Sequence, residues 1–223
     1  MISISPDTLS ILKNFSGINP NVVLRPGQKI KTISEAKNIL AIADVAEDFP
    51  RDMGIYDLNE FLSVFSIVDD GKLEFNEKSC NISNGKSRVQ YFFSEPSILT
   101  TPQKDITMPS CEVNLTFTKS TLDQVRKAAS VLGHTEMAIV GSEEGIQIRV
   151  QDSKDATANT YEMEVSAESQ ETPFEFVMNI SNLKIMDGDY NVGISSKLIS
   201  NWKNTSKSVE YFIALEKSSK YGV

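Results

Sequence analysis

Histidine and cysteine are scarce in this chain of 223 residues. It holds one histidine and two cysteines, Cys80 and Cys111. Structural zinc sites need several closely spaced Cys and His ligands, and disulfide-rich secreted domains need several cysteine pairs. We therefore expect no metal site and no disulfide scaffold, and we interpret the two cysteines as small apolar residues.

Motifs that bind phosphate or activate a nucleophile are also missing. The sequence contains no Gly-x-x-x-x-Gly-Lys-Ser/Thr, no Gly-x-Gly-x-x-Gly and no Gly-x-Ser-x-Gly. The acidic pairs at 69–70 and 143–144 each precede a glycine, where turns ordinarily carry acids. We expect no cofactor and no catalytic residue, and we predict that the chain is not an enzyme.

Long hydrophobic runs are absent as well. The opening residues have no basic stretch followed by a long apolar run, and no segment approaches the roughly 18 apolar residues that span a membrane. We expect no signal peptide, no membrane partner and a reducing cytoplasm. The hydrophobic fraction of 40% is typical of a globular protein, and the length suits one large domain or two small ones.

Four segments have the end signals and apolar spacing of amphipathic helices. Ser5 is a candidate N-cap of the first, and Thr118 and Gly133 bracket the third. Asp57 is a candidate cap of the second, with Glu60 three residues on as in a capping box. The predicted helices span 6–16, 57–68, 119–132 and 180–186.

Much of the remaining chain has the patterning of strands. Residues 145–151 and 161–165 alternate apolar and polar side chains, and Asp-Gly and Asn-Gly pairs mark turns. Further strands are expected at 88–93, 112–117, 173–178, 190–195 and 208–215. Many strands and few helices predict an α+β fold with antiparallel sheets.

The order of these elements occurs twice along the chain. In each half a longer helix precedes a short capped helix, an Asp-Gly turn and a strand, at 57–75 and again at 179–192. A proline-punctuated polar segment at 94–110 lies between the halves and is typical of a connector. We predict two similar domains, 1–108 and 109–223; the alternative is a single α+β domain with a long loop.

Basic residues gather on the predicted helices although the net charge of the chain is −8. The third helix carries Lys119, Arg126 and Lys127 on the side opposite its apolar stripe, and Lys13 and Lys184 lie on the polar sides of the first and fourth. Such a face attracts the phosphates of nucleic acid. The alternative is an ordinary solvated helix face.

Acidic residues gather instead on a predicted strand. Glu162, Glu164, Ser166 and Glu168 share one face of the segment 161–168. Helices that attract DNA and a sheet that repels it would confine DNA to one surface of the protein.

Four stretches of the sequence resemble the sliding clamps of T-even-type phages. They are the opening residues 9–19, the motif IYDLNEFLSVFSIVDD at 55–70, the segment 178–190 and the closing residues 211–216. The matches occur in the order of the family, spread over nearly the whole chain, and the length agrees.

The resemblance implies a fold and a function. Each subunit would hold two similar domains, each with two helices packed on antiparallel sheets, and three subunits would close into a ring around duplex DNA. The ring would tether the replicative DNA polymerase, be loaded by a clamp-loader ATPase and support late viral transcription through late transcription factors. It would act in the cytoplasm of the infected bacterial host and catalyse nothing.

The resemblance also implies two sets of functional residues. The candidates for contact with DNA are Lys13, Lys119, Arg126, Lys127 and Lys184. The second helix has no basic residue, so the first domain is expected to be less basic at its inner surface.

A partner's peptide tail would bind an apolar pocket between the connector and the last strand, where the candidates are Val45, Ile98, Leu99, Phe212 and Ala214. All five are also ordinary core residue types. The alternative function is that of an acidic β-rich binding or virion protein without enzymatic activity.

Overall fold

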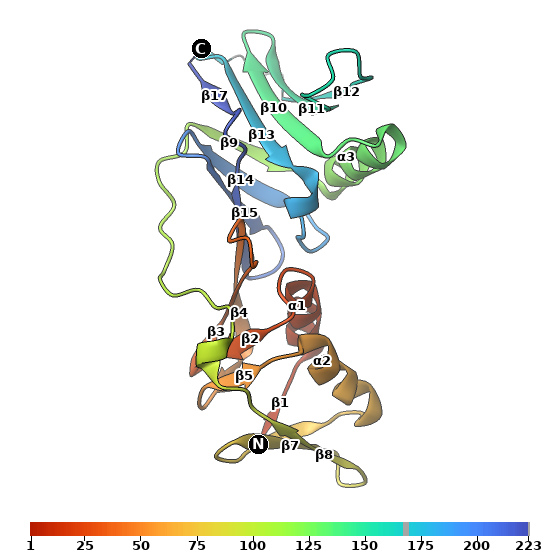
Figure 1. The fold of residues 1–223 in the computed structure, drawn as a ribbon, viewed down its shortest axis with the longest axis vertical. Helices are drawn as coiled ribbons and strands as arrows, with labels where there is room; N and C mark the ends of the chain where they lie inside the picture. The colour runs from red at the N-terminus through yellow and green to blue at the C-terminus, as the bar shows by residue number, and fades with distance from the viewer. Residues whose placement is uncertain (167–169, 223) are drawn as a thin grey trace. The chain divides into compact units, whose positions relative to one another are not determined.

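The computed structural model describes residues 1–166 and 170–222. The chain divides into two compact units. The first comprises residues 1–105 with the short segments 184–186 and 208–211, and the second comprises residues 106–183, 187–207 and the rest of the chain. Each unit combines helix and antiparallel sheet, which confirms the predicted α+β class (Figure 1).

Two α-helices of the first unit have N-terminal side-chain caps. The Ser5 hydroxyl accepts a hydrogen bond from the Thr8 backbone N–H at 3.2 Å, and Asp57 accepts one from the Glu60 N–H at 3.0 Å. These caps satisfy amides that the first helical turn leaves unpaired. The helices are α1 (Pro6–Ser16) and α2 (Leu58–Ile67), and both confirm the predicted segments.

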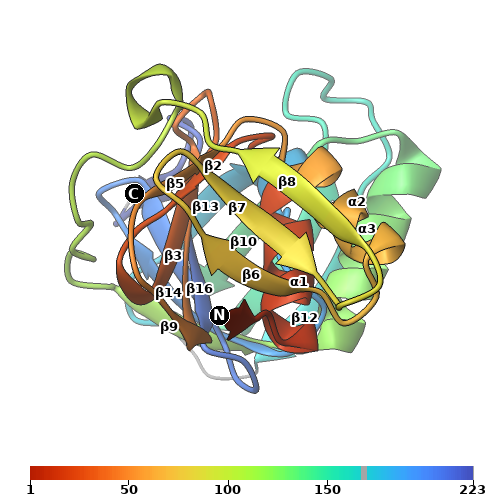
Figure 2. The same ribbon diagram turned by 90° about the horizontal axis from the view of Figure 1, so that it is seen from below.

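The strands of the first unit pair antiparallel. One sheet has the order β1-β6-β7-β8, and Figure 2 shows β7 between β6 and β8. A second pair joins β2 to β5, and a third joins β3 to the long strand β4. Their bounds are β1 (Ile2–Ser3), β2 (Val22–Leu24), β3 (Gly27–Ile33), β4 (Ile39–Phe49), β5 (Met53–Ile55), β6 (Lys72–Phe75), β7 (Ser79–Ser83) and β8 (Arg88–Phe92), followed by a 3-10 turn at Pro96–Ile98.

A buried acid connects β4 to the start of α1. Glu47 Oε1 accepts a hydrogen bond from the Ser5 backbone N–H and Oε2 accepts one from the Thr8 hydroxyl, both at 2.5 Å. Burial raises the pKa of Glu47, but the bonds from Thr8 and Ser5 outweigh burial and hold that pKa below its ordinary value. The carboxylate therefore stabilises the N-terminal turn of α1, whose backbone dipole also favours a negative charge.

The second unit is built around one α-helix and two sets of strands. One sheet has the order β12-β11-β10-β13-β17, and another set pairs β9 with β14 and β14 with β15. Their bounds are β9 (Val113–Phe117), α3 (Lys119–Leu132), β10 (Glu136–Ser142), β11 (Gly145–Gln151), β12 (Tyr161–Ser166), β13 (Phe174–Asn179), β14 (Tyr190–Ser195), β15 (Ile199–Asn204), β16 (Val209–Ala214) and β17 (Lys220–Tyr221).

An aromatic cluster forms part of the core of the second unit. The ring of Trp202 lies 4.8 Å from that of Phe117 and 6.2 Å from that of Tyr190, measured between centroids, and all three side chains are fully buried. The indole N–H donates to the Ser200 hydroxyl at 2.9 Å, which donates in turn to the Ile213 carbonyl. The one polar atom of the indole ring is thus satisfied inside the core.

The prediction of a fourth helix at 180–186 is wrong. Only Ile180–Asn182 forms a helical turn, of the 3-10 type, capped by Asn179. Leu183 and Ile185, which follow it, are buried, although a surface helix would place residues two apart on different faces. Residues 183–186 have no helical structure, so Lys184 does not lie on a helix.

The predicted acidic face of the strand at 161–168 is confirmed only in part. Glu162 and Glu164 are exposed on one side of β12. The register of β12 against β11 then shifts, and Ser166 lies opposite the buried Ile146. Ser166 therefore leaves the face of the two glutamates, because opposed residues of an antiparallel pair share a face. Glu168 lies outside the described residues.

Candidate nucleic-acid interface

Helix α3 presents its basic side chains on an exposed face. Thr118 caps its N-terminus by accepting a hydrogen bond from the Thr121 N–H at 3.1 Å, and Gly133 ends it in the left-handed conformation with φ of 72°. The apolar stripe of Leu122 and Val125 is buried, and the side opposite is polar. The helix predicted at 119–132 is confirmed, and with it the position of its three cations.

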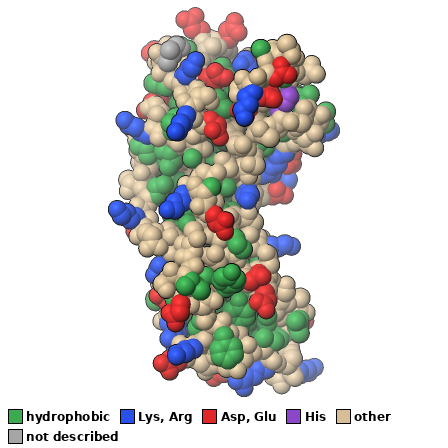
Figure 3. All heavy atoms as spheres, in the orientation of Figure 1, with side chains coloured by type: hydrophobic (Ala, Val, Ile, Leu, Met, Phe, Trp, Pro, Cys, Tyr) green, Lys and Arg blue, Asp and Glu red, His purple; other side chains and the backbone are tan. Residues whose placement is uncertain are grey.

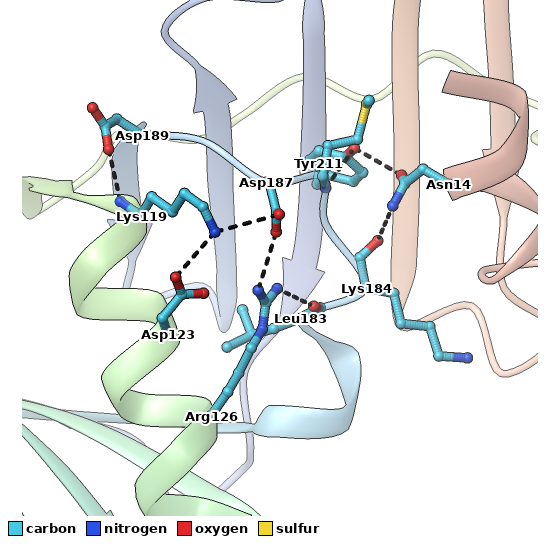
Figure 4. Close-up of polar contacts among 10 residues, drawn as sticks. Asn14, Lys119, Asp123, Arg126, Leu183, Lys184, Asp187, Asp189 and Tyr211 are labelled. Atoms are coloured by element: carbon cyan, nitrogen blue, oxygen red, sulfur yellow. Dashed lines mark hydrogen bonds and ion pairs between the residues drawn. The ribbon is translucent and has the colours of Figure 1, made fainter. Parts of the chain in front are cut away.

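Lys119 is held by carboxylates on two sides. Its Nζ lies 3.0 Å from Asp123 Oδ2, one turn along α3, and 3.3 Å from Asp187 Oδ2 (Figure 4). Its backbone N–H donates to Asp189 Oδ1 at 2.7 Å. The hydrogen bond to Asp123, followed by the one to Asp187, raises the pKa of Lys119 above its ordinary value, so this ammonium group stays charged at neutral pH.

Arg126 shares one of these acids. A guanidinium nitrogen lies 3.8 Å from Asp187 Oδ1, and another donates to the Leu183 carbonyl oxygen at 3.1 Å (Figure 4). Asp187 therefore lies between two cations that are about two turns apart on α3. Sequence reasoning placed Asp187 only in a turn, and no local signal ties it to a helix more than 50 residues earlier.

Lys127 differs from the other two cations. Its side chain is exposed, and the described part of the chain offers it no carboxylate within ion-pair distance. On and beside α3 there are thus three cations, Lys119, Arg126 and Lys127, and three carboxylates, Asp123, Asp187 and Asp189, none of which pairs with Lys127. We call these six residues the α3 charge cluster; its formal charge is zero, which the sequence did not indicate.

The other two predicted contacts, Lys13 and Lys184, both belong to the first unit. The amide nitrogen of Asn14, beside Lys13 on α1, donates to the Lys184 carbonyl oxygen at 3.1 Å. The amide oxygen of Asn14 accepts from the Tyr211 hydroxyl at 2.8 Å (Figure 4). Asn14 and Tyr211 thus position the segment that carries Lys184, a role that no local sequence pattern indicated.

The exposed face of α2 is not basic. Asp57 caps the helix and Glu60 lies in its first turn, while Ile67 near its other end is 70% exposed. Figure 3 shows one face of the molecule, on which Lys and Arg side chains stand singly among acidic and apolar ones. On the face that this figure shows, contact with phosphate would depend on individual cations.

The five predicted pocket residues differ in exposure. Val45 and Leu99 are buried in the first unit, and Phe212 is buried in the second. Ile98 is 68% exposed at the 3-10 turn of the connector, and Ala214 is half-buried at the end of β16. Their assignment to a peptide pocket stays a prediction.

The described residues contain no group of three or more His, Cys, Asp and Glu side chains placed to hold a metal ion. Burial raises the pKa of the Cys80 thiol to about 12, so the nucleophilic thiolate is not populated there at neutral pH. The ring nitrogen of His134 lies 2.7 Å from the Asn159 carbonyl oxygen in a surface contact. Within residues 1–166 and 170–222, no helix is long and apolar enough to cross a membrane.

Comparison with solved structures defines the class of fold. The chain is similar to A. fulgidus PCNA, solved with the C-terminal region of FEN-1, with a TM-score of 0.68 over 95% of this chain and 96% of that one at 10% identity. It is also similar to the Helicobacter pylori beta clamp bound to a DNA ligase peptide, with a TM-score of 0.67 over 97% of this chain and 66% of that one at 15% identity. The fold is that of a sliding clamp.

Comparison of sequences defines the family. Residues 5–101 match the family model of the DNA polymerase processivity factor, and residues 114–217 match that of the gp45 sliding clamp, C-terminal. The sliding clamp of Vibrio phage KVP40 is 30% identical over 96% of this chain and 99% of that protein. The sliding clamp of Escherichia phage RB69 is 30% identical over 98% of each. The chain belongs to the phage sliding clamps, the DNA polymerase processivity factors, which confirms the resemblance seen in its motifs.

Proposed function

We propose that three copies of this chain close into a ring around duplex DNA and tether the phage replicative polymerase during processive synthesis. The observation that carries the proposal is the tandem match of residues 5–101 and 114–217 to the two halves of the phage clamp family. In this proposal the clamp domains are 1–108 and 109–223, joined by the connector at 94–110. The chain itself catalyses no reaction.

Two strand edges are available to join subunits. β8 ends the sheet β1-β6-β7-β8, and β12 ends the sheet β12-β11-β10-β13-β17. An edge strand presents unpaired N–H and C=O groups that another chain can pair with. Contact between β8 of one subunit and β12 of the next is heterologous, and a heterologous contact yields a closed ring when its rotation closes.

DNA contacts in this ring would be weak and exchangeable. Lys13, Lys119, Arg126, Lys127 and Lys184 would each meet phosphate without reading base sequence. A ring that encloses DNA does not need tight binding, because its topology prevents escape. A surface with few free cations therefore suits sliding better than a strongly basic one.

Partner proteins would dock by short tails at the apolar residues Val45, Ile98, Leu99, Phe212 and Ala214. Support comes from two similar structures, in which a PCNA is bound to the C-terminal region of FEN-1 and a beta clamp is bound to a DNA ligase peptide. We propose the polymerase, a clamp-loader ATPase and late transcription factors as partners. The site of action would be the cytoplasm of the infected bacterial host.

The first test is the mass in solution across a dilution series, measured by multi-angle light scattering. The proposal predicts a mass near three times 24.7 kDa. A monomer at every concentration, with no ring formed on loader and DNA, would overturn it and favour an acidic binding module.

The second test concerns the α3 cations. Replacement of Lys119, Arg126 and Lys127 by Glu should weaken loading or sliding on DNA while the trimer persists, because α3 packs through its opposite, apolar face. Processivity of the polymerase reports the effect. Unchanged processivity would remove α3 from the DNA contacts and leave the ring itself untouched.

A further inference from the structure

A basic cavity lies in the first unit, away from the residues proposed to contact DNA. Its volume is about 430 Å³, within the range of ligand sites, and it is formed by β3, the loop before β3 and connector residues 101–105. Four cations line it, namely Arg25, Lys29, Lys31 and Lys104. Because the whole protein has a net charge of −8, four cations around one cavity require an explanation.

The cavity opens on the side of β3 that faces away from α1. Ile30 is fully buried and pairs with Ala43 of β4, while its neighbours Lys29 and Lys31 point the other way. On β4, Glu47 shares the buried side of Ala43 and bonds to the start of α1. Lys13 of α1 therefore belongs to a different surface of this unit from the cavity.

Three of the four cations already form ion pairs with carboxylates of the same chain. Lys31 forms an ion pair with Asp105, Lys29 Nζ lies 3.1 Å from Asp44 Oδ1, and Arg25 lies 3.9 Å from Asp52. Lys104 has no carboxylate within ion-pair distance among the described residues. Of the three carboxylates that pair with these cations, only Asp105 lines the cavity, and Lys104 remains an unpaired cation in its wall among the described residues.

Asp105 is the only acid in the cavity wall that the structure describes, and it is poorly anchored. Its side chain is 84% exposed, and it lies on the connector rather than on a strand. Exposed ion pairs contribute little net stability, so another carboxylate can replace Asp105 at Lys31 with little loss. Such an exchange would leave Lys31 paired throughout and release the connector end that carries Asp105.

We propose that this cavity binds carboxylate side chains of an acidic peptide segment on a partner protein, which displaces Asp105 from Lys31. A peptide fits better than DNA, because Val23, Pro26 and Pro102 add apolar contacts between the cations. The inference rests on the proposed function only in that a clamp docks partner proteins. The site is separate in composition from the five proposed pocket residues, none of which lines it.

The probe for this site is a short fluorescein-labelled peptide rich in Glu and Leu, compared with the same peptide carrying Gln in place of Glu. Fluorescence anisotropy on the full chain, without DNA, should show binding of the Glu peptide and at least about tenfold weaker binding of the Gln peptide. Added salt should weaken the binding, because the charges at the mouth of the cavity are exposed.

Three variants locate the binding. The double variant Lys29→Gln and Lys31→Gln should lose affinity about tenfold, and Asp105→Asn should gain about threefold because the resident carboxylate is gone. The matched control is Lys72→Gln and Lys86→Gln, two exposed lysines of the same unit outside the cavity. Circular dichroism establishes that each variant is folded.

Several outcomes would overturn the proposal. They are equal binding of the Gln peptide, an equal loss in the control, no gain in Asp105→Asn, or a short duplex DNA that binds these cations in preference to the peptide. A chain that binds the peptide but stays monomeric would refute the proposed ring and support this site. A trimer that does not bind the peptide would support the ring and refute this site.

Discussion

Replacement of Asp187 by Asn should increase the affinity of the protein for duplex DNA. Asp187 lies 3.3 Å from the Lys119 ammonium group and 3.8 Å from the Arg126 guanidinium. With Asp187 neutral, the α3 charge cluster changes from a formal charge of zero to +1. Phosphate then no longer competes with this carboxylate for the two cations, so contacts that are now partly blocked become available.

The size of the effect follows from counterion release. Each additional phosphate neutralised steepens the plot of log K against log salt by about 0.9. A single added contact should therefore increase the loss of affinity between 50 and 200 mM salt by a factor of about 3.5 relative to the unmodified protein. If all three subunits of a ring each add one contact, that factor rises to about 40, which is the upper limit. The stability of the fold should change little, because all three side chains lie at the surface.

The assay is anisotropy of a short linear duplex, whose free ends let a ring thread on, measured over a salt series. Glu143→Gln is the matched control, because it removes one negative charge from an exposed turn residue of the same unit that has no cation within ion-pair distance among the described residues. Equal slopes in Asp187→Asn and Glu143→Gln would refute the reasoning. Single-molecule diffusion of the loaded clamp should also be slower in Asp187→Asn.

Two further predictions concern stability. Glu47→Gln should lower the free energy of unfolding by about 1–2 kcal/mol at neutral pH, because the bonds from Ser5 and Thr8 lose a charged acceptor. The folded-state pKa of Glu47 lies below its unfolded value of about 4.3, so its contribution is complete above that value and is lost as pH falls through the folded pKa. Urea titrations of both proteins should therefore converge only at pH values below the folded pKa, and a constant difference would contradict this. Gly54→Ala should cost about 1–3 kcal/mol, because an added Cβ would lie 2.1 Å from the Ser94 carbonyl oxygen, and an unchanged urea midpoint would show that this contact relaxes freely.

Local signals in the sequence were sufficient to predict the bounds of elements that have capping residues or a clear alternation of apolar and polar side chains. Thr118 and Gly133 bracket α3 in the sequence and in the structure, and the alternation of 145–151 and 190–195 returns as β11 and β14 with the same bounds. A capping residue, a left-handed glycine or a period-two pattern involves only a few neighbouring residues, so it can be recognised without knowledge of tertiary contacts. The family could be recognised for the same reason, since its motifs are contiguous in the sequence.

The fourth helix failed because longer-range contacts outweigh a local cap. Asn179 does cap a turn, as its side chain predicts. Beyond that turn, the Leu183 carbonyl accepts from Arg126 in the second unit and the Lys184 carbonyl accepts from Asn14 in the first. Both carbonyls belong to the last turn of the predicted helix, which leaves its carbonyls without intrahelical partners, so these contacts fix the course of the segment, and burial of Leu183 and Ile185 draws it away from a helix.

The sequence by itself determined the class of fold, the ends of α1 and α3, and which cations lie on these two helices. Only the tertiary structure decided how those cations are paired. Asp187 reaches Lys119 from 68 residues away, and the connector brings Asp105 to Lys31 across 74 residues. A charge pattern in the sequence gives only the separation of residues along the chain. The electrostatic field at the surface depends on distances in space, and only the folded structure sets those distances.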